Sequence, residues 1–313
     1  MLIVAALGGY ALLRRGEPMS ADSRRTNVRK AALALAELIG AGHRVVVTHG
    51  NGPQVGLLAL QAAAGPADGA YPLDALGAES EGMIGYLIEQ ELGNVLPKGS
   101  LVAAILTQAR VDPDDIGFRN PTKPIGPIYD EAAARGLRKE RGWRMARDGD
   151  HWRRVVASPK PLEILESRVI GLLVDHGVNV ICAGGGGIPV VRTKGGAYLG
   201  IEAVIDKDAA SALLARQINA DMLVMLTEVA AVYLDFGAAN ARAVRRAGVG
   251  ELDAARFAAG SMGPKVRAAI DFASAMGRPA GIGRLQDAAA IVRGDAGTRI
   301  LPDAQGRNCS MHS

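Results

Sequence analysis

The segment 48–56 (THGNGPQVG) contains the residue types in this chain that are most suited to binding an anion. It follows a β-branched run at 44–47 and precedes an expected helix at 53–60. Glycines at such a turn let the backbone approach a ligand, and the first free N–H groups of the helix point toward it. The segment indicates either an anion site or a tight turn without a ligand. Its candidate binding residues are Gly50, Asn51 and Gly52.

Two further glycine-rich turns also follow strand-like runs. One closes the run 2–7 and the other closes the run 178–182. The carboxyl ends of parallel strands share one edge of a sheet, and ligands bind there. Glycine is abundant, at 40 of 313 residues, but these glycines cluster behind strands rather than scatter. We therefore expect all three turns to meet at one binding edge. The residues that these two turns add are Gly8, Gly9, Gly185 and Gly186.

Lysine is much rarer than arginine in this chain, with only eight lysines among 36 cationic residues. A compact ammonium is preferred over guanidinium where a point charge is needed, so rare lysines in turn-like contexts are candidates for chemistry. Lys123, Lys207 and Lys265 lie in such contexts, although any one of them could be an ordinary surface residue.

The composition excludes several classes of protein. A hydrophobic fraction of 49% supports a large core, and no apolar run reaches transmembrane length. The net charge is +4, but aromatic content is 4% and pairs such as Arg153-Arg154 read as solvated surface, so we expect no nucleic-acid partner. We expect no signal peptide, and two cysteines fit a reducing, cytoplasmic compartment. Cys182 reads as a core residue, and no His/Cys spacing suggests a protein-bound metal.

Alternating strand and helix signals predict an α/β fold whose mainly parallel sheet is covered on both faces. The expected strands are 2–7, 44–48, 101–107, 178–183 and 222–227. The expected helices, besides 53–60, are 25–39 capped by Gly40, 162–175 and 208–218.

The segment from about 111 to 160 interrupts this alternation. It is rich in proline and charge and shows little helix or strand periodicity. We interpret it as an inserted subdomain or lid in which Trp143 and Trp152 form a small core. Residues 303–313 read as a polar tail without a structural role.

Nine collinear segments resemble the carbamate kinases of the amino acid kinase fold family, over nearly the whole chain. HGNGPQVG is shared in weaker form by other amino acid kinases, whereas the ALGG start and the NPTKPIGP insert are more specific. The segments are ALGG at 6–9, THGNGPQVG at 48–56, EGMIGYLIEQEL at 81–92, NPTKPIGPIY at 120–129, RRVVASPKP at 153–161, AGGGGIPV at 183–190, EAVIDKD at 202–208, GSMGPKV at 260–266 and AGTRI at 296–300.

This resemblance implies a three-layer αβα sandwich with a small protruding subdomain, usually assembled as a homodimer. It implies an acyl-substrate lobe at 1–206, which includes the insert, a nucleotide lobe at 207–302 and the tail. The implied reaction is reversible phosphoryl transfer between carbamoyl phosphate and ADP, giving ATP and carbamate, which breaks down to ammonia and carbon dioxide. Arginine metabolism is one setting for such an enzyme.

The resemblance also implies residue roles. Carbamate is already an oxyanion, so its reaction needs alignment and charge neutralisation rather than a general base. Lys207 would bind the transferred phosphoryl group, Lys265 the nucleotide phosphates and Lys123 the carbamate or phosphoryl end. Asp208 would orient the lysines, and Mg²⁺ would arrive with ATP or ADP. The implied nucleotide-binding residues are Thr227, Tyr233, Met262, Gly263 and Lys265.

The chain departs from the family pattern at Tyr10, where relatives carry asparagine on the phosphate loop, and at Arg284 near the nucleotide. Tyrosine cannot present two N–H donors, so a phosphate contact would be missing unless its hydroxyl supplies that contact or the residue points into the lobe interior. The alternatives are therefore a nucleotide-binding protein with weak or altered activity, or a kinase for another carboxylate or carbamate-like substrate. A nucleotide-dependent dehydrogenase is disfavoured, because the chain has no G-x-G-x-x-G pattern after the first expected strand.

Overall fold

The computed structural model describes residues 1–9, 20–65, 71–258 and 260–302. Tyr10, Cys309 and the tail at 303–313 lie outside these ranges, so the expectations that concern them stay predictions.

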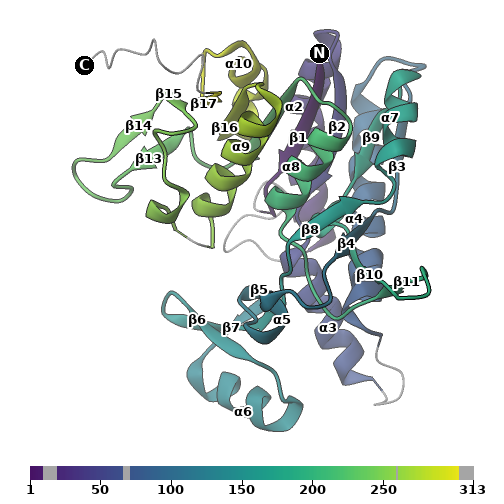
Figure 1. Ribbon diagram of the computed structural model, residues 1–313, viewed down its shortest axis with the longest axis vertical. Coiled ribbons are helices and arrows are strands. Elements are labelled where there is room, and N and C mark those ends of the chain that lie inside the picture. The colour runs from purple at the N-terminus through teal and green to yellow at the C-terminus, as the bar shows by residue number, and fades with distance from the viewer. Residues whose placement is uncertain (10–19, 66–70, 259, 303–313) are drawn as a thin grey trace.

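An eight-stranded sheet forms the centre of the molecule (Figure 1). Its neighbouring strands run parallel except where β16 meets β17, within the described part of the chain. In sheet order the strands are β15 (Arg246–Gly248), β17 (Thr298–Leu301), β16 (Ala280–Arg284), β12 (Met222–Thr227), β1 (Leu2–Leu7), β2 (Arg44–His49), β9 (Asn179–Cys182) and β3 (Val102–Ala104).

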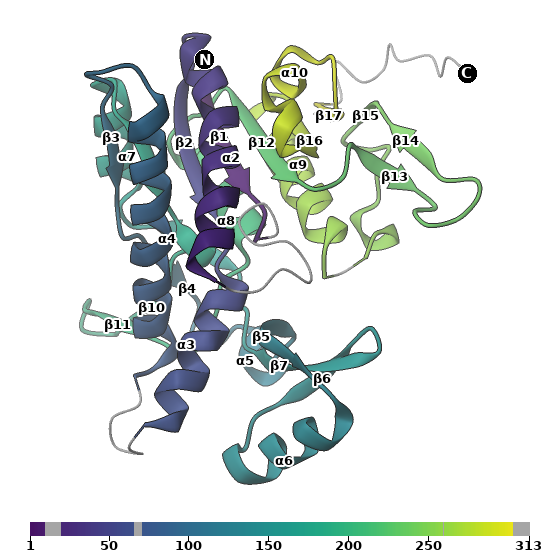
Figure 2. The ribbon, with the colours of Figure 1, turned by 180° about the vertical axis from the view of Figure 1, so that it is seen from behind.

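Helices cover both faces of this sheet and make three layers (Figures 1 and 2). Alternate side chains of β1 point to opposite faces: Val4 and Ala6 belong to one core, and Ile3 and Ala5 to the other. The first core is covered by α7 (Ser167–Asp175), α8 (Lys207–Gln217) and α9 (Met262–Met276), and the second by α2 (Ala21–Gly40), α4 (Leu73–Val95) and α10 (Ala288–Arg293). The predicted sandwich with a mainly parallel sheet is confirmed.

Smaller sheets and short helices extend this body. A four-stranded sheet has the order β11 (Tyr198–Gly200), β10 (Ile188–Arg192), β4 (Gln108–Val111) and β8 (Pro161–Ile164). A hairpin pairs β13 (Val232–Leu234) with β14 (Arg242–Val244). The remaining body helices are α3 (Gly52–Ala64) and the 3₁₀ turns η1 (Gly184–Gly186), η2 (Ala254–Arg256) and η3 (Leu285–Asp287).

The proline-rich insert forms a separate projection at one end of the body (Figures 1 and 2). It contains three antiparallel strands in the order β5 (Lys123–Tyr129), β7 (His151–Val156) and β6 (Met145–Asp148), with α5 (Ile116–Arg119) and α6 (Glu131–Arg141).

The tryptophans of the insert do not form a small core, so that expectation is wrong. Both rings are half-buried and stack against arginines: Arg138 lies 4.6 Å from the centre of the Trp152 ring, and Arg154 lies 4.3 Å from that of Trp143. Guanidinium groups cover the ring faces because the small sheet has too few apolar side chains to enclose them.

Three local predictions are corrected. The expected helix at 162–175 is strand β8 followed by α7, and its periodic residues Val169 and Leu172 are exposed while Ile170 and Val174 are buried. The expected strand at 101–107 is shortened to β3, because the chain turns away to begin β4 in another sheet. Gly40 ends α2 as its last helical residue, and the left-handed turn that follows lies at Gly42, with φ 83°.

The proposed division at residue 206 stays a prediction. The central sheet is continuous across it, because β12 of the second part pairs directly with β1 of the first.

Candidate active site

The three glycine-rich turns meet at the carboxyl edge of the central sheet. They follow β1, β2 and β9, which are neighbours in the sheet and run parallel. A Cβ atom at Gly50 would lie 3.0 Å from the Gly9 backbone, so the first two turns are in close approach. The prediction of a shared edge is confirmed, and this edge opens into a cavity of about 1300 Å³.

Most of the predicted substrate-side glycines line this cavity. Gly185 lies on it, whereas Gly186 does not; a Cβ atom at Gly186 would lie 2.8 Å from the Ile205 side chain. The Asn51 side-chain amide donates to Ser80 Oγ at 2.7 Å. The predicted substrate-binding residues that line the cavity are Gly8, Gly9, Gly50, Asn51, Gly52 and Gly185.

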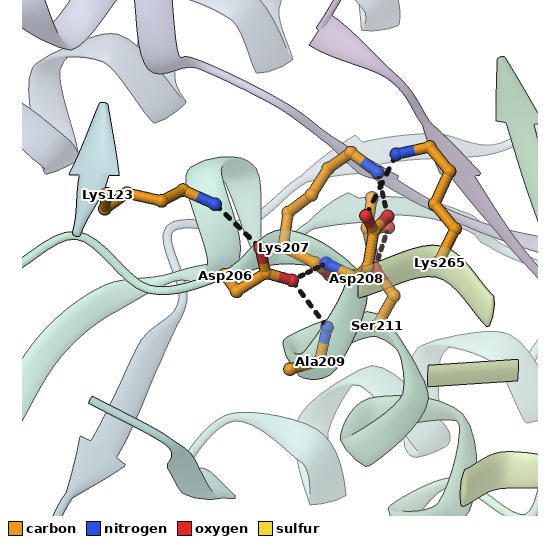
Figure 3. Close-up of polar contacts among 8 residues, drawn as sticks. Lys123, Asp206, Lys207, Asp208, Ala209, Ser211 and Lys265 are labelled. Atoms are coloured by element: carbon orange, nitrogen blue, oxygen red, sulfur yellow. Dashed lines mark hydrogen bonds and ion pairs between the residues drawn. The ribbon is translucent and has the colours of Figure 1, made fainter. Parts of the chain in front are cut away.

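Lys207, Asp208 and Lys265 form a buried charge cluster in the cavity wall (Figure 3). Lys207 and Asp208 occupy the first turn of α8, and Lys265 lies in the first turn of α9. One carboxylate oxygen of Asp208 bonds Lys207 Nζ, and the other accepts from Lys265 Nζ at 3.0 Å. The single carboxylate thus holds two ammonium groups side by side.

Lys123 reaches the same cavity from β5 of the projecting subdomain. Its Nζ lies 2.7 Å from Asp206 Oδ2 (Figure 3). Asp206 is the N-cap of α8, and its other oxygen accepts from the N–H groups of Asp208 and Ala209 at 3.0 and 3.1 Å. The cluster of three lysines and two aspartates has one net positive charge, which suits an anionic ligand.

The electrostatic environment keeps both aspartates ionised. Burial alone would raise the pKa of Asp208, but the charges of Lys207 and Lys265 outweigh it and hold that pKa well below its usual range. The pKa of Asp206 is lowered as well, because Lys123 outweighs the effect of burial. Burial lowers the pKa of Lys207, and the charge of Asp208 opposes that shift.

The predicted nucleotide residues are placed around another part of the cavity. Thr227 is the last residue of β12. Tyr233 on β13 packs edge-on against Phe236, with 5.9 Å between the ring centres. Met262 also lines the cavity, whereas Gly263 is buried beneath it among the carbonyl groups of 254–258. The structure therefore brings Thr227, Tyr233, Met262 and Lys265 together at the cavity and gives Gly263 a packing position.

Asp206 and Arg153 are among the charged residues that line the cavity but were not predicted as site residues. Asp206 had a usable signal, because an aspartate immediately before a helix is a common N-cap. Arg153 was interpreted as solvated surface, which is wrong for this residue. Its side chain is only 13% exposed, and its Nη2 donates to Gly126 O at 2.9 Å. No pattern in the local sequence reveals that contact.

Helix α4 forms a polar wall behind the glycine turns. The buried carboxyl of Glu81 accepts from Gly184 N at 2.9 Å and from Thr107 N at 3.4 Å. Burial raises the pKa of Glu81 to about 8, although the two N–H groups oppose the shift. His49 packs against the same turn and does not line the cavity, and burial lowers its pKa to about 4.

The raised pKa of Glu81 predicts a stability change with pH. The folded pKa of about 8 lies above the usual 4.5, so the stabilising neutral carboxyl is fully retained below pH 4.5 and is lost as pH rises through 8. Glu81→Gln does not titrate and should gain stability relative to the native chain between pH 5 and pH 9, on the order of a few kcal/mol. Thermal unfolding of both proteins across this range measures the difference.

The matched control is Glu79→Gln, at an exposed position on the same helix. Its difference from the native chain should stay nearly constant with pH. A constant difference for Glu81→Gln as well would show that the buried carboxyl does not titrate in this range.

The Amino acid kinase family profile matches residues 1–283. The chain therefore belongs to the amino acid kinase family, which is the class of protein that this sheet edge and its lysine cluster indicate.

Individual relatives narrow the class. A carbamate kinase of Rhizobium meliloti is 55% identical over 302 residues, which cover 96% of this chain and 93% of the relative. The solved carbamate kinase of Giardia lamblia bound to citric acid is 43% identical with a TM-score of 0.90, covering 96% of this chain and 98% of that one. The same Giardia lamblia enzyme bound to AMP-PNP is 41% identical with a TM-score of 0.87, covering 96% and 98%. Within the family the chain groups with the carbamate kinases and is a phosphotransferase.

Among the helices of the described ranges, none is long and apolar enough to cross a membrane. Within the same residues, no three His, Cys, Asp or Glu side chains are arranged to hold a metal ion.

Proposed function

We propose that this enzyme transfers a phosphoryl group between carbamoyl phosphate and ADP, giving ATP and carbamate, and that the reaction is reversible. The observation that carries the proposal is the cluster of Lys123, Lys207 and Lys265 at the glycine-rich sheet edge. The close similarity to carbamate kinases over nearly the whole chain supports the choice of substrate.

The cluster supplies what this chemistry requires. The carbamate oxygen that attacks ATP is already ionised, so no side chain has to remove a proton from it. The ammonium groups of Lys207 and Lys265 offset the charge that develops on the phosphoryl oxygens. Asp208 holds both ammonium groups in place before the substrates bind, so little reorganisation is needed during the reaction.

The two substrates occupy different parts of the cavity in this proposal. The N–H groups of Gly8 and Gly50 already donate to the carbonyls of Leu226 and Leu7. The other backbone N–H groups of the turns at 8–9, 50–52 and 185 bind the carbamoyl or phosphoryl oxygens. The region of Thr227, Tyr233, Met262 and Lys265 binds the nucleotide. The AMP-PNP complex of the similar Giardia lamblia enzyme supports a nucleotide site on this fold.

Mg²⁺ would bind mainly through the nucleotide phosphates. Asp206 and Asp208 are the carboxylates paired with the lysines, and all four of their oxygens already accept hydrogen bonds. This arrangement fits an ion that keeps most of its ligands from water and phosphate. The ion would neutralise phosphate charge when it is bound.

Further expectations accompany the family. We propose a cytoplasmic homodimer, with arginine metabolism as one physiological setting. The alternative of a binding protein with weak activity rested on Tyr10, and the comparisons give it no support.

The proposed substrate is tested by comparing phosphoryl donors. Purified protein with ADP and Mg²⁺ should form ATP from carbamoyl phosphate at least about tenfold faster than from acetyl phosphate, measured as kcat/KM in a coupled assay. Faster reaction with acetyl phosphate would favour a kinase for another carboxylate. ATP formation at the rate without enzyme, from either donor, would contradict the proposed reaction.

A further inference from the structure

The backbones of helix α3 and subdomain strand β5 touch at a pair of glycines. A Cβ atom at Gly56 would lie 1.9 Å from Gly126 Cα and 2.0 Å from Gly126 N. No side chain fits between the two backbones at this point. Gly126 also has φ +73°, a conformation that glycine adopts without strain. The contact is therefore as close as the two backbones can make it.

The surrounding residues hold β5 against the body at this contact. Val55 and Ile125, the neighbours of the two glycines, are fully buried in one apolar cluster with Val156 and Val204. Arg153 of β7 donates to the Gly126 carbonyl and pairs with Asp148 at 3.3 Å, so all three strands of the subdomain are tied to the same point.

Lys123 lies three residues before Gly126 on the same strand. Its ammonium group reaches Asp206 at 2.7 Å, at the edge of the lysine cluster. A strand is stiff over so short a distance, so a shift at Gly126 would move Lys123 with it. The place where β5 rests on α3 thus determines where this ammonium group lies in the cavity.

We propose that Gly56 is a positioning residue that sets the location of Lys123 by letting β5 rest directly on α3. The inference rests on the proposed phosphoryl transfer. A methyl group at this position must push β5 away by about 1 Å or more to reach an ordinary contact distance, and a misplacement of this size can cost about a hundredfold in rate.

The test is a double-mutant cycle between Gly56→Ala and Lys123→Ala. Gly56→Ala alone should lower kcat about tenfold to a hundredfold, with the KM for ADP within about threefold of the native value. In the Lys123→Ala background the same substitution should change kcat by less than about threefold, because the group that it displaces is absent. Losses that multiply would contradict the inference, as would native kcat in folded Gly56→Ala.

Two further proteins control for folding. Gly93→Ala places a methyl group in open space on α4 and should keep native kcat. Ile125→Val removes one methyl group from the apolar cluster that holds β5 against α3, without a steric clash, and replaces Gly56→Ala if that variant does not fold. It should lower kcat a fewfold in the native background and leave kcat unchanged in the Lys123→Ala background.

Amide hydrogen exchange of β5 without substrates gives an independent measurement. Gly56→Ala, or Ile125→Val in its place, should speed exchange in residues 123–129 relative to the native protein. A native enzyme that forms no ATP would refute the proposed function, whereas unchanged exchange in β5 would refute the positioning role.

Discussion

Lys207→Ala should lower kcat by at least about a hundredfold while it changes the KM for ADP much less. The Lys207 side chain lies close to Gly50 in the second glycine-rich turn. Its ammonium group forms an ion pair with Asp208, which also pairs with Lys265. An interaction that strengthens as charge develops affects kcat more than binding, and removing one such donor typically costs about two to three decades. Steady-state kinetics in the direction of ATP formation measures both constants.

Lys30→Ala, which removes an exposed lysine of α2, is the control and should react like the native enzyme. Thermal unfolding should show that Lys207→Ala is folded. A folded Lys207→Ala variant with kcat within about threefold of native would remove Lys207 from the catalytic set.

Asp208→Asn should also lower kcat by about a hundredfold and should move the alkaline limb of the pH–rate profile to lower pH. The asparagine carries no charge, so both ammonium groups lose the carboxylate that pairs them. Burial already lowers the pKa of Lys207, and Asp208 is the main group that opposes this shift. Without it Lys207 loses its proton at lower pH, and activity that needs the ammonium is lost there as well.

The measurement is kcat from pH 6 to pH 10 for the native chain and the variant. Asp271→Asn, at an exposed position on α9, is the matched control and should keep the native profile. An alkaline limb that stays in place in Asp208→Asn would show that this carboxylate does not maintain the charge of Lys207.

The site was predictable where its residues follow strands of one sheet. The turns after β1, β2 and β9 could be brought together from sequence because parallel strands share a carboxyl edge. The lysines were identified by their rarity and by the resemblance, and the structure places all three around one pair of aspartates.

Local sequence patterns failed to predict structure at positions where contacts with distant segments determine it. Arg153 looks like a surface residue in sequence, but the Gly126 carbonyl and the cavity wall surround it. The apolar spacing of 162–175 fits a helix, yet Pro161–Ile164 pairs antiparallel with β4, a strand 53 residues earlier in the chain. Nothing in the sequence around Glu81 indicates that its carboxyl accepts hydrogen bonds from the N–H groups of Thr107 and Gly184, which are distant in the chain. Each of these contacts depends on which segments meet in the fold.

The most direct test of the lysine-lined site is a single-turnover transfer experiment with carbamoyl phosphate carrying a labelled phosphoryl group. Excess enzyme, ADP and Mg²⁺ are mixed with the labelled donor, and ATP, free phosphate and protein are separated at each time. Direct transfer between two aligned substrates predicts that the label appears in ATP, with none bound to protein and no free phosphate beyond the reaction without enzyme. Label trapped on the protein, or released as phosphate while ADP is unchanged, would contradict this account.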